Sequence, residues 1–511
     1  MSTHSAAGSN PGTDLVQLDV QSASHAAFAT EDAQSVRAQK AVAPIYANRI
    51  KVYPKRVDGT FRRLKWAVLA FCLAVYYLVP WLRWDRGPTA PDQAILIDLP
   101  GRRAYFFFVE IWPQEVYFLA GLMIFGAIAL FLVSSLFGRV WCGYACPQTV
   151  WTDLFMWVER WVEGDRNARL KLDRAPWTAG KLARKTAKHA IWLAIAAATG
   201  GAWVFYYADA PTTLRAIFTG AASTNIYFFV GLFTATTYLL AGWAREQVCT
   251  YMCPWPRFQA AMFDENTLTV TYHGWRGEPR GSHKAGESWE GRGDCVDCRQ
   301  CIAVCPTGID IRDGQQLECI GCGLCIDACA VVMDKVGRPR RLISFDTIAG
   351  TQAKAEGRGT AYRLLRPRVI LYLALLALVG AGMLAAFVLR STLDLTVLHD
   401  RAPLFVMLSD GSVRNGYTIK IVNKTQAMQH DVLTVDGLPG ATLRVEEANA
   451  PAGTTTREVL DAQPDTVATY RLYVTAPRRP LPESTPLTFR LRDQETGTTA
   501  AHGTVFLAPH P

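Results

Sequence analysis

Twelve of the thirteen cysteines fall into four tight groups with regular spacing. The two longest groups share the pattern Cys-x2-Cys-x2-Cys-x3-Cys, over 295–305 (the first cysteine run) and 319–329 (the second cysteine run). In such runs three thiolates hold one cubane cluster, and the fourth crosses to the neighbouring cluster. The spacing therefore predicts two [4Fe–4S] clusters, one held by Cys295, Cys298, Cys301 and Cys329 and the other by Cys319, Cys322, Cys325 and Cys305.

Zinc and disulfides explain these two runs less well. A structural zinc ion takes four ligands, and eight thiols in overlapping runs exceed that number. Disulfides are rare on the cytoplasmic face, where we expect this segment to lie. The second run departs from the usual pattern because Ala330 stands where Pro306 follows the first run. This departure changes the rigidity of a turn and removes no ligand.

Two shorter groups, "WCGYACP" at 141–147 and "VCTYMCP" at 248–254, each follow an apolar stretch. The four-residue spacing predicts that both thiols of a pair lie on one helical face, and the proline behind each pair should disturb the helix. An amphipathic segment follows each proline, so the unit is repeated and two copies could pool four thiolates. These membrane-edge pairs are Cys142 with Cys146 and Cys249 with Cys253.

Several occupants suit the membrane-edge pairs. Soft thiolates suit Cu(I), and four cysteines could also hold a third iron–sulfur cluster. Alternatively, the four thiols could pack as small apolar side chains. Haem is not favoured, because only His189 lies at a membrane segment and a pair of axial histidines cannot be built. The remaining cysteine, Cys72, lies within an apolar stretch and is interpreted as packing.

Five apolar stretches approach the roughly 20 residues that cross a bilayer, and they cover about 64–82, 116–137, 189–208, 224–243 and 369–389. Lysine and arginine gather before the first, after the second and before the fifth stretch. The positive-inside rule then predicts a cytoplasmic N-terminus and a periplasmic C-terminus. Basic residues beside membrane segments also explain the net charge of +9 without nucleic acid, so membrane lipid is the expected partner.

The expected fold class is a multidomain membrane protein with about five transmembrane helices, an inserted two-cluster ferredoxin domain and a C-terminal all-β domain. Alternating strands and turn residues in the last part predict an immunoglobulin-like sandwich without cysteine. The expected boundaries are a disordered tail at 1–45, a four-helix membrane region at 46–244, a cytoplasmic insert at 245–368 with the cluster module at about 290–335, a fifth helix at 369–389 and a periplasmic domain at 390–511.

The whole arrangement resembles the FixG/CcoG/RdxA family of accessory proteins for cbb-type cytochrome c oxidase. The resemblance covers roughly residues 40–511, and the motifs that carry it are "DLPGRRAYFFF" at 98–108, "WCGYACPQTVW", "CTYMCPWPRFQAAMFD" and both cysteine runs with "VMDK" behind them. It implies a bacterial inner-membrane cupric reductase that converts Cu(II) to Cu(I) for the oxidase assembly machinery or a copper chaperone. The implied catalytic and copper-binding residues are Cys142, Cys146, Cys249 and Cys253.

Two other functions remain open at this stage. The protein could be a membrane polyferredoxin that carries electrons from quinol to another reductase, although the chain has no Cys-x2-Cys-His motif for an onward haem. It could also be a non-catalytic assembly factor whose clusters serve only as structural supports. The sequence identifies no electron donor, and the thiol pairs could meet within one chain or across a homodimer.

Overall fold

The computed structural model describes residues 51–87, 90–284, 286–359, 362–425, 427–446, 456–478 and 481–509. The expected disordered tail at 1–45 lies outside these residues. The chain divides into two compact units, which are described separately. The first unit comprises Met1–Leu82 and Gln93–Ala381, and the second comprises Arg83–Asp92 and Gly382–Pro511.

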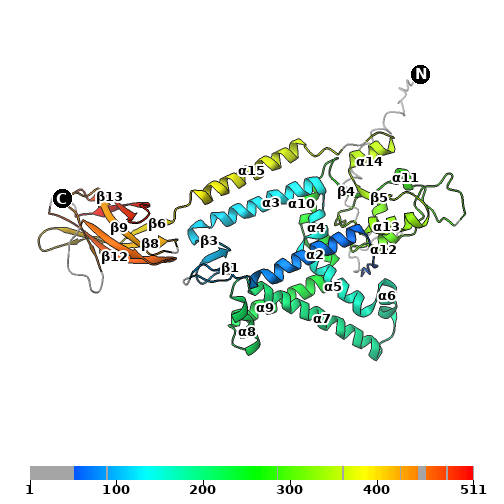
Figure 1. The fold of residues 1–511 in the computed structure, drawn as a ribbon, viewed down its shortest axis with the longest axis horizontal. Coiled ribbons are helices and arrows are strands. Elements are labelled where there is room, and N and C mark those ends of the chain that lie inside the picture. Colours follow the sequence, from blue (N-terminus) through cyan, green and yellow to red (C-terminus); the bar gives the residue numbers. More distant parts are fainter. Residues whose placement is uncertain are drawn as a thin grey trace, which may run out of the picture. The chain divides into compact units, whose positions relative to one another are not determined.

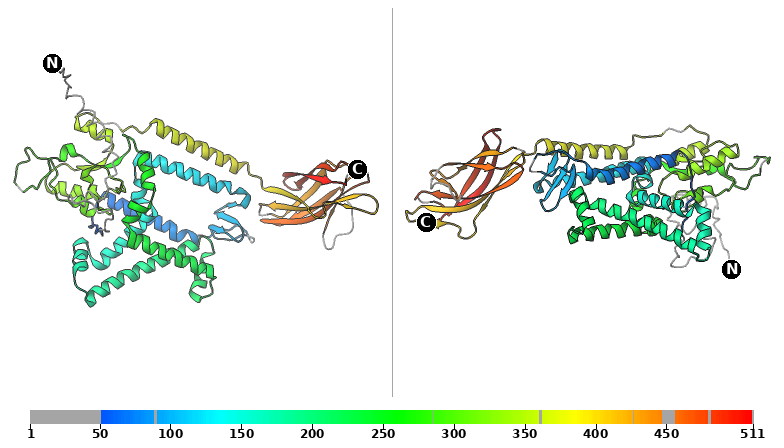
Figure 2. Two further views of the ribbon diagram at one scale, coloured as in Figure 1. Left: turned by 180° about the vertical axis from the view of Figure 1, so that it is seen from behind. Right: turned by 60° about the horizontal axis from the view of Figure 1, so that its bottom comes forward.

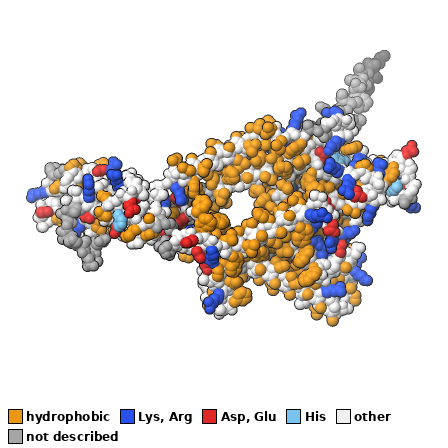
Figure 3. Space-filling view, viewed as in Figure 1, with side chains coloured by type: hydrophobic (Ala, Val, Ile, Leu, Met, Phe, Trp, Pro, Cys, Tyr) orange, Lys and Arg blue, Asp and Glu red, His pale blue; other side chains and the backbone are white. Residues whose placement is uncertain are grey.

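Four helical segments are long and apolar enough to cross a membrane, judged by length and composition: Thr60–Trp81, Pro113–Phe137, Thr224–Ala244 and Pro367–Val388. They contain helices α2 (Thr60–Leu78), α3 (Tyr117–Phe137), α9 (Thr224–Thr237) with η3 (Tyr238–Ala244), and α15 (Pro367–Val388). Large apolar side chains on these helices point outward, as Figure 3 shows over the helical part of the first unit. A surface of this kind is stable in lipid rather than in water, so the chain is a membrane protein.

The fifth expected span, 189–208, falls largely within α7 (Ala179–Val204). This helix is 26 residues long, but it is not among the four candidate spans. Its first three turns carry Lys181, Arg184, Lys185 and Lys188. The apolar part that remains is short, so the expected count of five spans is not confirmed within the described residues.

A buried charge network fixes the amphipathic helix α5 (Pro147–Glu163) against its neighbours. The Glu159 carboxylate is fully buried and lies 2.8 Å from Arg169, 2.9 Å from Arg245 and 3.6 Å from Lys188. Burial alone would raise the pKa of Glu159, but these cations lower it to about 2. The carboxylate therefore stays charged, and it ties α5 to α6 (Arg166–Arg174), to α7 and to the chain behind η3.

The cysteine module (Thr269–Asp346) begins and ends with a two-stranded antiparallel sheet. Strand β4 (Thr269–Tyr272) pairs with β5 (Ile343–Asp346), which closes the loop that carries all eight run cysteines. Figure 1 shows short helices beside this sheet. They are α11 (Gly274–Gly277), α12 (Gln300–Val304), η5 (Ile311–Asp313) and α13 (Leu324–Lys335), and α14 (Ile348–Ala355) follows the sheet.

The rest of the first unit contains a small sheet and short helices. The "DLPGRRAYFFF" segment forms a hairpin whose turn contains Pro100 and Gly101, and the Arg103 guanidinium lies over the Trp112 ring at 4.0 Å. Figure 2 shows α7 and α9 side by side, in agreement with their extensive contacts. The remaining elements are η1 (Val79–Trp81), β1 (Ile95–Asp98), β2 (Arg103–Phe106), β3 (Val109–Ile111), η2 (Pro113–Glu115), α4 (Val140–Tyr144), α8 (Ala210–Thr219), η4 (Val248–Met252) and α10 (Trp255–Ala261).

The second unit holds two antiparallel sheets around one buried core. One sheet has the order β10-β12-β8-β6 with β7 paired to β8, and the other has the order β11-β9-β13-β14. Buried side chains from both sheets, such as Ile419 and Phe489, belong to one cluster. The strands predicted for this part of the chain are present. The bounds are β6 (Leu393–His399), β7 (Val406–Met407), β8 (Val413–Asn423), β9 (Gln429–Asp436), β10 (Thr442–Val445), β11 (Arg457–Ala462), β12 (Thr466–Ala476), β13 (Ser484–Asp493) and β14 (Thr499–Leu507).

Candidate metal centres

The two cysteine runs fold into equivalent loops. In each loop the second and fourth residues after the first cysteine have positive φ angles: 49° at Asp297 and 52° at Arg299, against 68° at Gly321 and 72° at Gly323. A residue in the left-handed region on each side of the second cysteine turns the chain sharply. The helix that follows each loop, α12 or α13, begins just before the third cysteine of its run.

One predicted ligand set shares a small cavity. The cavity is lined by Cys305, Cys319, Cys322 and Cys325, and also by Cys301 of the other predicted set. Cys305 therefore leaves its own run and joins the second run, as the crossing pattern predicts. Burial raises the pKa of Cys319 to about 12, and the neighbouring Cys322 and Cys305 sulfurs add to this rise.

The other predicted set is also brought together. Cys329 packs in one cluster with Cys295 and in another with Cys301. Burial raises the pKa of Cys329 to about 12, and the next largest contributions come from Cys298 and Cys295. The fourth cysteine of the second run thus lies beside the first run, and both predicted crossings are present in the fold.

The predicted occupant of each cysteine set is a cubane and not a single ion. Among the described residues, no three histidine, cysteine or acidic side chains are placed to hold one metal ion. One tetrahedral zinc ion would draw four sulfurs to within about 2.3 Å of itself. A cubane instead binds each thiolate to a different iron, so its ligands stand further apart. The role of both cysteine sets as ligands of such cubanes stays a prediction.

The membrane-edge pairs lie at breaks between helices. Cys142 lies on α4, but α4 ends at Tyr144, and Cys146 directly precedes α5, which begins at Pro147. Cys249 lies on the π-helical turn η4, and Cys253 follows its end. The prediction that both thiols of a pair share one helical face is therefore wrong, because each helix ends before the second cysteine. The predicted disturbance at the prolines is confirmed.

The two pairs nevertheless meet. All four thiols line one cavity of about 200 Å³, the four-thiol cavity. Burial raises the pKa of Cys142 and of Cys249 to about 12 each. The Cys142 thiol donates a hydrogen bond to Oε1 of Gln259 at 3.2 Å, and the amide of Gln259 donates to Ser134. With a raised pKa these thiols are protonated at neutral pH, and a metal ion that binds them must displace the proton.

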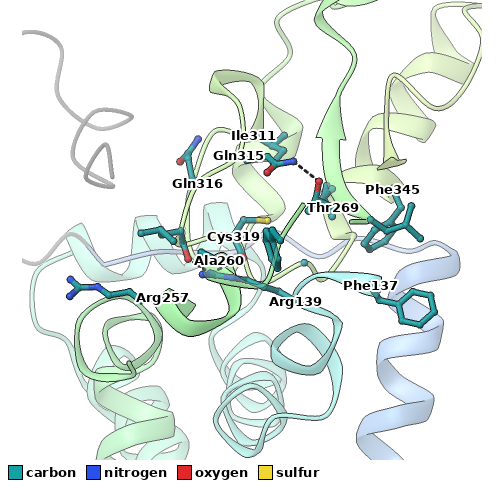
Figure 4. A pocket seen from close by; sticks show the side chains of 15 residues that line it. Phe137, Arg139, Arg257, Ala260, Thr269, Ile311, Gln315, Gln316, Cys319 and Phe345 are labelled. Carbon is teal, nitrogen blue, oxygen red and sulfur yellow. Dashed lines mark hydrogen bonds between the residues drawn. The ribbon is translucent and has the colours of Figure 1, made fainter. Parts of the chain in front are cut away.

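Arg139 connects the four-thiol cavity to the second cysteine run. Its buried guanidinium donates to the carbonyl oxygens of Leu317, of Cys319 at 3.2 Å and of Pro256 at 2.7 Å. Burial lowers the pKa of Arg139, whereas the nearby Cys319 and Cys142 sulfurs act in the opposite direction. Figure 4 shows Arg139 and Cys319 together on the wall of an adjoining pocket of about 250 Å³.

Gly143 lets α4 touch the second cysteine run directly. A Cβ atom at this position would lie 2.8 Å from the carbonyl oxygen of Ile320 and 3.1 Å from Cα of Cys322. The neighbouring Tyr144 hydroxyl donates to the carbonyl oxygen of Cys322 at 3.0 Å. The backbones of the first membrane-edge pair and of the second run are therefore in contact, without an intervening side chain.

The roles of Arg139, Gly143 and Gln259 were not predicted from the sequence. A signal for Gly143 was available, because the second pair has Thr250 at the matching position and only the first pair has glycine. Glycine between two functional cysteines indicates close approach of another backbone. No comparable signal marked Arg139 or Gln259, whose partners are 117 or more residues away along the chain.

Three family models match separate parts of the chain. A "4Fe-4S dicluster domain" matches residues 244–348, which include both cysteine runs, and a "4Fe-4S binding domain" matches residues 119–167. The model for the "IG-like fold at C-terminal of FixG" matches residues 383–509. These matches show a chain with iron–sulfur domains and an Ig-like C-terminal domain.

Curated relatives match nearly the whole chain. "Nitrogen fixation protein FixG" of Rhizobium meliloti (strain 1021) is 53% identical over 88% of this chain and 90% of the relative. "Protein RdxA" and "Protein RdxB" of Cereibacter sphaeroides are each 50% identical, over 89% and 90% of this chain and over 95% and 97% of the relatives. With its iron–sulfur domains and apolar helices, this chain is a membrane iron–sulfur redox protein that belongs to the FixG/RdxA family.

Proposed function

We propose that the protein reduces Cu(II) to Cu(I) and supplies it for assembly of a cbb-type cytochrome c oxidase. The supporting observation is that all four thiols line one cavity. Helix α4, which carries Cys142, is in backbone contact with the second cysteine run at Gly143. When bound, the two clusters supply electrons one at a time, and reduction of Cu(II) needs one electron. The chain's own residues supply the copper ligands and the short contact to the clusters.

In this proposal the thiols of the membrane-edge pairs hold copper. Sulfur ligands favour Cu(I) over Cu(II), so binding at these thiols favours the reduced product. Each thiol must lose its proton to water when the metal binds, because the thiolate is the ligand. The fixed positive charge of Arg139 offsets part of the negative charge that these thiolates then carry.

The location follows from the distribution of basic residues. We place the protein in the bacterial inner membrane, with the N-terminus and the insert at 245–368 in the cytoplasm and the domain at 390–511 in the periplasm. The membrane region at 46–244 and the helix at 369–389 complete this division. An edge strand of the periplasmic domain could pair with a strand of the oxidase or of a copper chaperone.

Copper analysis of a double variant tests the copper site. In Cys142→Ser with Cys249→Ser, one thiol of each pair is lost, so bound copper should fall to background while iron and sulfide stay unchanged. Cys72→Ser is the matched control, since this lone half-buried thiol lies on α2, outside the four-thiol cavity. Unchanged copper binding in the double variant would contradict the assignment.

A third [4Fe–4S] cluster is the second candidate for the four-thiol cavity. The "4Fe-4S binding domain" model covers Cys142 and Cys146, and all four thiols line the same cavity. The protein would then be a polyferredoxin that passes electrons from quinol to another reductase. Anaerobic preparations should contain about eight iron atoms per chain with two clusters and about twelve with three.

Turnover assays separate the enzymatic proposals from a non-catalytic assembly factor. A cupric reductase should reduce Cu(II) when a chemical electron donor is supplied, and the Cys142 and Cys249 double variant should not. Oxidation of quinol without copper would favour the polyferredoxin. If the protein retains its iron, binds copper and reduces neither substrate, the clusters are structural and the enzymatic proposal is wrong.

A further inference from the structure

A second large cavity lies where α2 and α5 meet the cysteine module. It has a volume of about 520 Å³ and takes its lining from three parts of the first unit. The chain before α2 contributes Lys55 and Arg56, and α5 contributes Arg160 and two tryptophans. The module closes the cavity with Val304, Pro306 and Leu324. None of these residues belongs to the proposed copper site.

One wall of the cavity carries a buried guanidinium with an unused donor. Arg62 is only 7% exposed, and its Nη1 donates to both carboxylate oxygens of Asp153 at 3.0 and 2.9 Å. The guanidinium also lies over the Trp66 ring at 4.6 Å. Its Nη2 atom is buried and has no hydrogen-bond partner in the described part of the chain. A buried charged donor without an acceptor is costly, which indicates that an acceptor binds here.

Arg160 supplies a second cation to the same cavity. It lies on α5, and neither a hydrogen bond nor an ion pair engages its guanidinium within the described residues. Burial lowers its pKa to about 10, because the charged guanidinium is partly removed from water. The lining has four cations and three carboxylates, a formal excess of one positive charge, and two of the carboxylates, Asp153 and Asp58, are paired with Arg62 and Arg56 of the same lining. The cavity therefore favours an anion.

The cavity is bordered by aromatic side chains typical of a membrane surface. Trp157 and Trp161 are stacked with centroids 6.1 Å apart and are 44% and 69% exposed. With Trp66 they form a group of three tryptophans at the start of the α2 span. Tryptophan prefers the boundary between lipid headgroups and acyl chains. A ligand of this cavity should thus have an anionic head beside arginines and an apolar part beside tryptophans.

We propose that this cavity binds the phosphate headgroup of an anionic phospholipid. Arginine pairs well with phosphate through two parallel hydrogen bonds, and Arg62 and Arg160 each have donors to offer. Pro306 and Leu324 directly follow and precede Cys305 and Cys325, so the bound lipid holds the cysteine module against α2 and α5. This role goes beyond the copper chemistry and does not depend on it.

Lipid analysis of the full-length protein tests the proposal. The protein is placed in nanodiscs of phosphatidylcholine with or without phosphatidylglycerol, extracted into detergent, and measured by native mass spectrometry. We expect about one phosphatidylglycerol to be retained per chain. Arg160→Gln should weaken its retention about tenfold, because a charge-assisted contact to phosphate is lost. Arg160→Lys, which keeps the charge, should retain more lipid than Arg160→Gln.

The control removes the same charge elsewhere. Arg184→Gln lies at an exposed position of α7 that is not part of the cavity, and it should retain the lipid. Equal losses in Arg160→Gln and Arg184→Gln would show a nonspecific effect of charge and overturn the proposal. Inorganic phosphate at millimolar concentration is the second arm. If free phosphate binds and displaces the lipid, the site takes a soluble phosphate, and the lipid assignment is wrong.

Discussion

The first and second cysteine runs have the same spacing and the same backbone twist, but their surroundings differ. The second cysteine of the first run, Cys298, is exposed, whereas the matching Cys322 is buried. The first run has Asp297 and Arg299 at its two left-handed positions, and the second run has glycine at both. The cysteine spacing is thus the same in both runs, while the residues between the cysteines differ.

Contacts explain this difference. A Cβ at Gly323 would lie 2.8 Å from the Phe61 ring of α2, and a Cβ at Gly321 would lie 3.3 Å from Arg139. The second run is therefore pressed against the membrane part of the unit and has no room for side chains. At Asp297, by contrast, the carboxylate accepts a hydrogen bond from Arg312 at 2.6 Å. The glycines between the cysteines thus mark the run that packs against α2 and Arg139.

Replacing a predicted ligand should have the largest effect, which is the loss of one cluster. Alanine at Cys322 removes a ligand of the second set, so about half of the iron, or about four atoms per chain, should be lost. Cys305→Ala should remove the same cluster even though Cys305 belongs to the first run in sequence. Iron analysis and electron paramagnetic resonance of the reduced variants measure which cluster remains.

The matched pair for this test is Cys298→Ala and Cys329→Ala. Both variants should lose the other cluster. Their electron paramagnetic resonance spectra should therefore agree with each other and differ from the spectra of Cys322→Ala and Cys305→Ala. If Cys305→Ala and Cys298→Ala leave the same spectrum, each run holds its own cluster and the crossing assignment is wrong.

Alanine at Gly323 should have the next largest effect. A left-handed alanine costs about 1–2 kcal/mol, and the contact with Phe61 adds about 1–3 kcal/mol of overpacking. Arg299→Ala, at the matching position of the first run, should change stability by less than about 0.5 kcal/mol because the backbone already accepts a side chain there. Thermal unfolding of the anaerobic proteins measures both changes.

Gly337→Ala separates the two causes at Gly323. Gly337 has a φ of 66°, and a Cβ there would meet nothing within 4 Å, so only the backbone cost applies. Gly337→Ala should therefore be destabilised less than Gly323→Ala. Equal losses in the two variants would mean that contact with α2 does not constrain the second run.

Gly143→Ala should have an intermediate and more local effect. The added methyl group would push α4 away from Ile320 and Cys322, so hydrogen exchange should increase in the second run and remain unchanged in the first. If the proposed function is correct, the rate of Cu(II) reduction should fall while the iron content stays the same. The control is Gly126→Ala, where a Cβ meets nothing within 4 Å. Unchanged exchange near Cys322 would contradict the proposed contact.

The sequence predicted what depends on local spacing. The cysteine runs, the C-terminal strands and the disturbance at Pro147 follow from short patterns, and each is visible in the fold. The span at 189–208 was harder to predict, because α7 is charged at one end and apolar at the other. The shared helical face of each thiol pair was predicted wrongly, since helix breaks rather than spacing position Cys146 and Cys253.

The contacts between distant segments could not be predicted. Arg139 is bonded to residues that follow it by 117 to 180 positions, and nothing near it in the sequence indicates these partners. The same holds for the charge network around Glu159 and for the cavity beside Arg160, whose walls come from separate parts of the chain. Such features arise from packing, which one sequence without its fold does not specify.

Asp297→Asn should have the smallest effect and tests the solvent-facing run alone. The hydrogen bond from Arg312 lowers the pKa of Asp297 below its usual value. The charged carboxylate therefore stabilises the fold above the unfolded pKa of about 3.9, and this contribution is lost as pH falls through the lower folded pKa. Because Asp297 is 36% exposed and Arg312 keeps Asp310, the loss at pH 7 should be under about 1 kcal/mol.

The pH dependence of the two proteins then distinguishes an ion pair from simple packing. Thermal unfolding of the wild type and of Asp297→Asn should differ at pH 7, and the difference should shrink below about pH 3.9, where the wild-type carboxylate takes up its proton. A constant difference down to pH 3 would show that the side chain acts by shape and not by charge. In the second run no carboxylate occupies the matching position, because Gly321 stands there against Arg139. Acid should thus weaken the ion pair between Asp297 and Arg312 in the first run, and the second run has no equivalent pair at this position.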